Sequence, residues 1–160
     1  MKVIWAPWRI EYLKAKKEKG CVLCKRSRGK QDQQSYILHR GKKNFVILNR
    51  YPYINGHLMV VPYRHTARFE DLREDEMAEH HQLIRKSVLV LKKAFKPHGF
   101  NIGMNIGQAG GAGIAEHLHM HVVPRWPADT GCMPVLADTR SLPQYLQDTY
   151  KILKKGWVNL

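Results

Sequence analysis

The sequence of 160 residues is poor in cysteine, in acidic residues and in long apolar segments. Its three cysteines are too few, and odd in number, for the disulfide framework of a small secreted protein. No apolar run approaches membrane-spanning length, and Pro7 and Arg9 interrupt the short apolar stretch near the N-terminus, which lacks a signal-peptide pattern. We therefore expect a soluble cytoplasmic protein in a reducing compartment, with no membrane partner.

The shortage of acidic residues leaves a strong positive charge. Thirteen acidic residues face 27 lysines and arginines, which gives a formal net charge of +14. Such a surface raises the local concentration of anions, so nucleic acid, phosphorylated metabolites and anionic membranes all fit as partners. Much of the excess lies between Lys14 and Lys30, and a solvated basic face is the alternative interpretation of that run.

The pattern of apolar residues predicts one α+β domain over residues 1–160. Hydrophobic residues make up 44% of the chain, which is enough for a core without disulfides. The alternation and turn signals predict five strands, at residues 36–39, 44–49, 57–61, 100–106 and 117–123. A long helix at 74–96 and a tail helix at 143–155 follow from helical spacing. Residues 1–35 form a basic N-terminal segment, 36–126 the core and 127–160 the tail, with a mainly antiparallel sheet.

The long helix carries apolar residues at alternating steps of four and three. This spacing places them on one face, which we expect to be the face in the core. The stripe consists of Met77, His81, Ile84, Val88, Leu91 and Phe95.

Three histidines at a spacing of two are the most distinctive feature. On a strand, His117, His119 and His121 share one face, at roughly 7 Å per step along the backbone. Three imidazoles spread over roughly 13 Å do not fit one metal ion without a distorted strand. A neutral imidazole that attacks phosphorus, beside others that donate to phosphate oxygens, suits the row better. The glycine-rich residues 107–113 can bring backbone N–H groups close to an anion, although a plain flexible loop has the same composition.

The sequence of residues 117–123, HLHMHVV, resembles the motif of the histidine triad family, in which histidines alternate with apolar residues. Residues 49–52 (NRYP) and 56–62 (GHLMVVP) resemble the nucleotide-binding hairpin of that family, and Pro124-Arg125 is common after its motif. The resemblance covers residues 36–126. Residues 126–134 resemble the small bacterial branch that includes diadenosine tetraphosphate phosphorylases.

The resemblance implies a role for each matching residue. His119 is the nucleophile that forms a covalent nucleotidyl intermediate at the α-phosphate, and the carbonyl of His117 accepts its Nδ1 proton. His121 donates to an α-phosphate oxygen, and His57 is a fourth histidine that supports the triad. The implied nucleotide-binding residues are Asn49 for ribose and Asn105, Gln108, Gly111, Gly113 and His121 for phosphate.

Cys21 and Cys24 form a single CxxC pair, which fits half of a zinc site, a redox pair or chance. Some bacterial triad proteins resemble this chain in combining such a pair with two histidines, which here are His65 and His117. The resemblance thus implies a tetrahedral structural zinc site that holds the N-terminal segment on the core.

The acceptor of the second step stays open from the sequence. Water makes a hydrolase and inorganic phosphate makes a phosphorylase, whereas an amine leaving group makes a phosphoramidase. Two other classes also remain: a non-catalytic nucleotide- or RNA-binding module, and a metal-dependent hydrolase. The aromatic and basic residues near the N-terminus favour the first of these, and the family resemblance implies a homodimer. The residues in question are Trp5, Trp8, Arg9, Tyr12 and Lys14.

Overall fold

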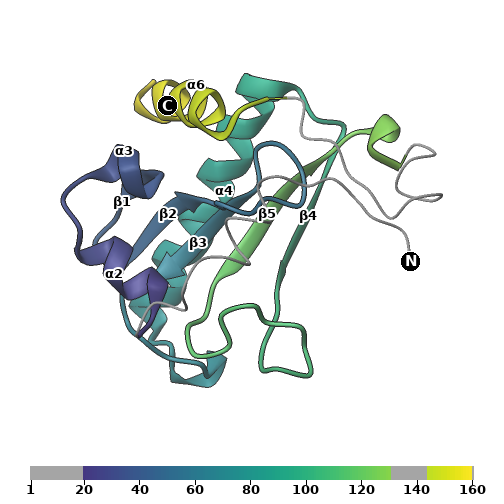
Figure 1. Ribbon diagram of the computed structural model, residues 1–160. Helices are drawn as coiled ribbons and strands as arrows, with labels where there is room; N and C mark the ends of the chain where they lie inside the picture. The colour runs from purple at the N-terminus through teal and green to yellow at the C-terminus, as the bar shows by residue number, and fades with distance from the viewer. Residues whose placement is uncertain (1–19, 131–143, 160) are drawn as a thin grey trace, which may run out of the picture.

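A five-stranded antiparallel sheet forms the centre of the computed structural model, which describes residues 20–130 and 144–159 (Figure 1). The strand order is β1-β2-β3-β5-β4. The strands are β1 Ile37–Arg40, β2 Asn44–Leu48, β3 Leu58–Pro62, β4 Gly99–Met104 and β5 Met120–Arg125. The helices are α2 Val22–Arg28, α3 Asp32–Ser35, α4 Glu74–Phe95 and α6 Leu146–Val158, with 3-10 turns at Phe69–Asp71 and Pro127–Thr130. The predicted α+β class, the five strands and both predicted helices are confirmed.

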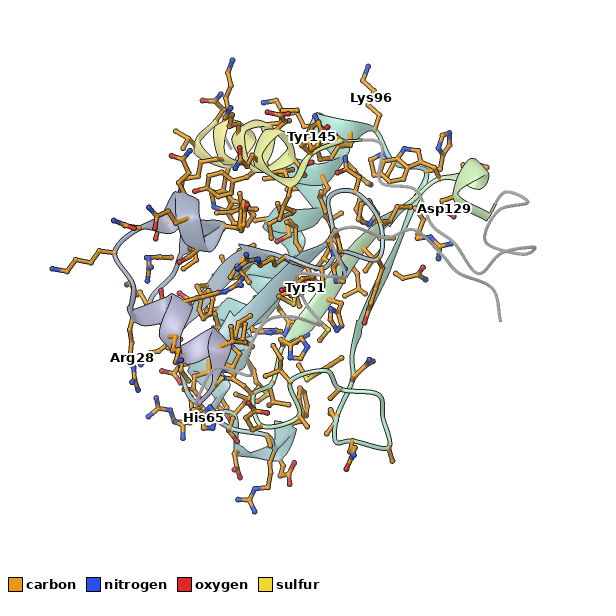
Figure 2. The ribbon with its side chains drawn as sticks, in the orientation of Figure 1. Arg28, Tyr51, His65, Lys96, Asp129 and Tyr145 are labelled. Carbon is orange, nitrogen blue, oxygen red and sulfur yellow. The ribbon has the colours of Figure 1, made fainter. Side chains whose placement is uncertain are left out.

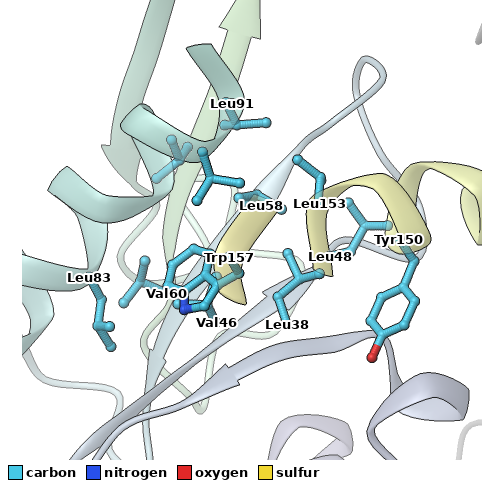
Figure 3. Packing of buried hydrophobic residues seen from close by; sticks show 12 residues of the cluster. Leu38, Val46, Leu48, Leu58, Val60, Leu83, Leu91, Tyr150, Leu153 and Trp157 are labelled. Carbon is cyan, nitrogen blue, oxygen red and sulfur yellow. The ribbon is translucent and has the colours of Figure 1, made fainter. Parts of the chain in front are cut away.

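Both faces of the sheet are covered, so every residue of β2 and β3 is buried. Alternate side chains face opposite sides, because successive Cβ atoms of a strand point in opposite directions. Val46, Leu48, Leu58 and Val60 pack against α4 and α6, as Figure 3 shows for the larger of two apolar clusters. The residues between them, together with Leu23 of α2, form a second cluster on the opposite face. The histidines of interest lie on this second face.

The face of α4 that lies in the core is shifted by about one residue from the predicted face, so this prediction is wrong. The buried residues are Glu76, His80, Leu83, Ser87, Val90 and Leu91, whereas His81 is exposed. Three of the buried residues are polar and form hydrogen bonds: Glu76 accepts from Arg64, His80 donates to the Val60 carbonyl, and Ser87 donates to Leu83. A search for apolar periodicity passes over such residues. Ile84, Val88 and Phe95 of the predicted stripe pack at the margin of the core.

The prediction that all three triad histidines share one strand is also wrong. Strand β5 begins at Met120, so only His121 lies within it. The backbone N–H of Leu118 donates to the carbonyl of Thr66 (2.8 Å), and Thr66 lies beyond the end of β3. This hydrogen bond holds the segment before β5 outside the ladder of the sheet. His117 and His119 therefore approach the sheet on an irregular segment.

No helix is predicted from the sequence in the N-terminal segment, but its described part contains α2 and α3. These helices are too short to show a period, and α2 places only Leu23 in the core. Cys132 and the aromatic and basic residues from Trp5 to Lys14 lie outside the described residues. Within the ranges described, none of the helices is both long and apolar enough to cross a membrane.

The buried His80 makes stability depend on pH. It is 3% exposed, and burial lowers the pKa of its imidazole from 6.5 to about 4. As the pH falls, the unfolded chain binds this proton before the folded chain does. The contribution of His80 to stability is therefore complete above pH 6.5 and is lost between pH 6.5 and 4.

Replacing this imidazole should flatten the pH dependence. Between pH 6.5 and 4, the free energy of unfolding should fall less in His80→Gln than in the unchanged chain. The difference between the two decreases should reach about 3 kcal/mol. Urea unfolding at a series of pH values measures this difference. His98→Gln, the same change at an exposed histidine outside α4, should keep the original slope. An unchanged slope in His80→Gln would contradict the prediction.

Candidate active site and metal centre

His119 is held in one tautomer by the backbone. Its Nδ1 lies 2.9 Å from the carbonyl oxygen of His117, and a carbonyl only accepts. Nδ1 therefore carries the proton, and Nε2 carries a lone pair. His119 is 4% exposed, so this lone pair lies at the edge of a largely buried ring.

His121 is held in the opposite tautomer by a chain of two histidines. The backbone N–H of Tyr53 donates to Nδ1 of His57 (3.1 Å), and Nδ2 of Asn49 approaches the same nitrogen (3.3 Å). The proton of His57 is therefore on Nε2, which donates to Nδ1 of His121 (2.9 Å). This leaves Nε2 of His121 as an N–H donor.

The ring with the nucleophilic nitrogen and the ring with the hydrogen-bond donor thus lie side by side. The rings of His119 and His121 are 4.8 Å apart between centroids and nearly perpendicular. Burial, together with the neighbouring imidazoles, lowers the pKa of His57 to about 3 and that of His121 to about 4. Both are neutral at pH 7, which is the state that the two-histidine chain requires. Such a pair can attack an electrophilic phosphorus while donating to one of its oxygens.

A cavity of about 250 Å³ opens beside His121. Its floor is formed by residues of β4 and β5 that face the histidine side of the sheet, among them Gly103 and Val123. Tyr53 and Ile54 form a wall, and Arg125 with Asp129 lies at the far end. The Tyr53 ring also packs on His57 and His121, at 4.6 and 5.7 Å between centroids.

Of the six predicted nucleotide-binding residues, His121 and Asn105 line the cavity. Nδ2 of Asn105 donates to the carbonyl of Gly111 (3.2 Å), which ties the glycine-rich loop to the end of β4. Asn49 lies behind His57, where its Oδ1 accepts from the N–H of Tyr51 (2.9 Å). The other predicted residues, Gln108, Gly111 and Gly113, lie in the exposed loop and do not line this cavity. The binding roles assigned to all six remain predictions.

Four residues from three separate parts of the chain meet at the other end of the triad. The ligand atoms of Cys21, Cys24, His65 and His117 all lie within 4.8 Å of one another. Nδ1 of His117 is 3.3 Å from the Cys21 sulfur and 3.4 Å from the Cys24 sulfur. In a tetrahedral zinc site with bonds of about 2.0–2.3 Å, the ligand atoms are roughly 3.3–3.8 Å apart. The spacing and the sulfur and nitrogen donors therefore fit a zinc ion.

The orientation of His117 also fits a metal ligand. Its Nε2 lies 2.9 Å from the Pro62 carbonyl oxygen, so Nε2 carries the proton and Nδ1 directs a lone pair at the cysteines. The pair of cysteines is held in place by α2, which Arg40 of β1 fastens to the sheet through the carbonyl oxygens of Ser27 and Gly29 (2.5 and 2.6 Å). In Figure 2, His65 beside α2 marks this end of the site, and Asp129 after β5 marks the other.

Sequence reasoning missed most of the residues that surround the cavity. Tyr53 and Ile54 lie between the predicted strands at 44–49 and 57–61 and were assigned no role, although Tyr53 stands four positions before His57. Gly103 looked like an ordinary strand position. The glycine-rich loop separates β4 from β5 in the sequence. The position of Gly103 opposite His121 is therefore apparent only in the folded sheet.

Comparison with known proteins agrees with this geometry. The HIT domain family model matches residues 30–128. The chain belongs to the HIT family. This HIT protein is 38% identical to the AP-4-A phosphorylase of Mycobacterium tuberculosis over 162 residues, which cover 96% of this chain and 83% of the relative. It is 33% identical to the bis(5'-nucleosyl)-tetraphosphatase (asymmetrical) of Schizosaccharomyces pombe over 95 residues, 59% of this chain and 52% of that protein.

Solved structures have the same fold as this HIT protein. A hypothetical histidine triad nucleotide-binding protein from Sulfolobus tokodaii strain 7 aligns with a TM-score of 0.70 at 27% identity, over 88% of this chain and 93% of the other. A Zn-bound histidine triad family protein from Mycobacterium smegmatis aligns with a TM-score of 0.69 at 24% identity, over 88% and 94%. The latter similarity supports the fold.

The two neighbouring histidines should show opposite tautomers in solution. In a ¹⁵N-labelled sample at neutral pH, His119 should be protonated on Nδ1 and His121 on Nε2, because their hydrogen-bond partners differ. The ¹⁵N chemical shifts of the ring nitrogens measure this directly. In His57→Phe, which removes the donor to Nδ1, His121 should lose its single tautomer while His119 keeps its own. The same tautomer for both rings in the unchanged chain would contradict the network.

Proposed function

We propose that this chain is an enzyme that transfers or hydrolyses a nucleotidyl group from dinucleoside polyphosphates, such as diadenosine tetraphosphate. The observation that carries the proposal is a pair of adjacent rings: His119, with a lone pair on Nε2, and His121, which has an N–H donor and lines a cavity. The relatives named AP-4-A phosphorylase and bis(5'-nucleosyl)-tetraphosphatase support this substrate class.

In the first step, Nε2 of His119 attacks the α-phosphorus. The P–N bond forms as the bond to the bridging oxygen breaks, and the remaining polyphosphate leaves with the electron pair. The imidazole ring becomes cationic, which turns the hydrogen bond from Nδ1 to the His117 carbonyl into a charge-assisted one. The N–H of His121 donates to a non-bridging oxygen, where negative charge develops.

In the second step, an acceptor attacks the same phosphorus and the P–N bond breaks, which restores the neutral imidazole. With water the released nucleotide is AMP, and with inorganic phosphate it is ADP. The relative at 38% identity is named a phosphorylase, so we propose phosphate as the first acceptor to examine. Splitting the transfer in two is what allows the acceptor to be chosen separately from the donor.

Replacing the nucleophile tests this proposal. The purified protein should convert diadenosine tetraphosphate to ATP and ADP when phosphate is present, or to ATP and AMP if water is the acceptor. His119→Ala should lower kcat by about a thousandfold or more, because the covalent route is lost. Nucleotide chromatography measures both. His98→Ala, the same change at an exposed histidine, should keep full turnover. Turnover of His119→Ala at the wild-type rate would refute the mechanism.

We also propose that Cys21, Cys24, His65 and His117 hold a structural zinc ion. The spacing of their ligand atoms supports this, as does the fixed tautomer of His117. Burial and the neighbouring Cys21 raise the pKa of the Cys24 thiol, so a bound cation would be needed to stabilise its thiolate. When bound, zinc would supply crosslinking between α2 and the core rather than chemistry.

Removing a zinc ligand should destabilise the fold. The protein purified from zinc-containing medium should carry about one zinc ion per chain, and Cys24→Ser should lose it. The melting temperature of Cys24→Ser should fall by about 10 °C or more, because metal binding contributes directly to folding. Elemental analysis and calorimetry measure the two quantities. Cys132→Ser is the matched control and should change neither, whereas zinc-free wild-type protein would contradict the site.

The remaining expectations concern assembly and location. We propose a homodimer, which is supported by the position of β4 at an open edge of the sheet with Ile102 47% exposed. We likewise propose a cytoplasmic location, consistent with the two free cysteines among the described residues. The division of residues 1–160 into a basic segment, a core and a tail within one domain remains a prediction.

A further inference from the structure

We propose that the cavity beside His121 binds the nucleoside of the departing half of a dinucleoside polyphosphate. This inference rests on the proposed function and adds the means by which the site would distinguish two nucleosides joined by phosphates from a nucleotide with only one. Three observations carry it: a glycine in the floor of the cavity, flat groups on its walls, and the closed end of the histidine row.

Gly103 occupies a strand position where a side chain would fit without any clash. A Cβ atom built there meets no atom within 4 Å, and its φ is not in the left-handed region, so neither space nor backbone geometry requires glycine. Glycine weakens a strand interior, and valine or isoleucine would stabilise it. Gly103 pairs with His121 in the sheet and lines the cavity. A side chain at this position would therefore fill the space beside the triad, which the glycine leaves for a ligand.

The walls of the cavity offer flat surfaces suited to a purine base. Tyr53 lines the cavity, is 46% exposed and packs its ring against His57 and His121. At the far end, the guanidinium of Arg125 is fixed in a plane by Asp129, which accepts from Nε and Nη2 at 2.7 and 2.8 Å, and by Asn101, which accepts from Nη1. Aromatic rings and fixed guanidinium planes both stack on bases. Because Asp129 neutralises its charge, Arg125 is better suited to stack on a base than to bind a phosphate.

The direction of the histidine row assigns the cavity to the departing half. The row is closed at His117, which is 1% exposed and surrounded by the cysteine pair and His65. The end at His117 thus leaves no room for a polyphosphate, whereas the end at His121 adjoins the cavity. Asn49, the residue expected to bind the ribose of the transferred nucleotide, does not line this cavity. The transferred nucleoside is thus expected outside it.

Binding measurements on the full chain test this assignment. In the His119→Ala background, which prevents turnover, calorimetry gives the Kd values of diadenosine tetraphosphate and of adenosine 5′-tetraphosphate, which lacks the second nucleoside. We expect the dinucleoside to bind at least about tenfold more tightly, and Gly103→Val to abolish most of that ratio. Gly99→Val is the matched control: the same strand, the same face and equally open space, but outside the cavity lining. It should keep the ratio.

Tyr53→Leu provides a second variant, which removes the stacking ring but keeps the backbone N–H that donates to His57. It should lower the same ratio, and thermal unfolding confirms that each variant is folded. Equal weakening of both ligands would place the transferred nucleoside in the cavity and overturn the inference. Unchanged affinities in Gly103→Val and Tyr53→Leu, or no preference in the parent protein, would overturn it too. The proposed function stands or falls separately, on turnover by the unchanged chain.

Discussion

The placement of His117 is the constraint on which the rest of the site depends. Its carbonyl accepts the Nδ1 proton of His119, its Nε2 donates to the Pro62 carbonyl, and its Nδ1 faces the two cysteines. One residue thus joins the end of β3, the N-terminal helix α2 and the proposed nucleophile. A displacement of His117 would change the tautomer of His119 and the geometry of the cysteine and histidine cluster together, although the two serve different purposes.

The site differentiates chemically identical side chains by means of the backbone. His119 has its proton on Nδ1 because a carbonyl faces it, and His121 has its proton on Nε2 because the N–H of Tyr53 fixes His57. Neither arrangement needs a charged partner. The turn that positions Tyr53 depends in turn on Gly56, whose φ of 77° suits glycine and whose added Cβ would press on Leu91 and Phe95 of α4 at 3.2 and 3.3 Å. The packing of α4 against this turn therefore affects the triad through one hydrogen bond, which the N–H of Tyr53 donates to His57.

Prediction from the sequence succeeded where the types of the side chains alone determine the local structure. Strands β2 and β3 were predicted to within one residue because all their residues are apolar or buried, and α4 was predicted because Pro97 and Gly99 end a long amphipathic run. The buried face of α4 was mistaken, because it includes three polar residues, Glu76, His80 and Ser87, and the partners of Glu76 and His80 lie outside the helix. The four cysteine and histidine residues were named from a family resemblance, and the fold does bring them together. The cavity escaped prediction, since Gly103 and Tyr53 line it together only when β4 has paired with β5 and the turn before β3 has folded.

The neutrality of the buried imidazoles connects this geometry to the charge of the whole chain. Burial lowers the pKa of His57 to about 3 and that of His121 to about 4, so neither ring attracts an anionic substrate by charge at pH 7. Attraction at long range must come from the surface, where the net charge of +14 resides. Protonation of His121 would also place an N–H on Nδ1, directly against the N–H of His57 Nε2, so it would require the supporting ring to give up its bond with Tyr53. The low pKa values and the fixed tautomers are thus two consequences of the same closed chain of hydrogen bonds, which keeps a donor, and not a second competing nucleophile, beside His119.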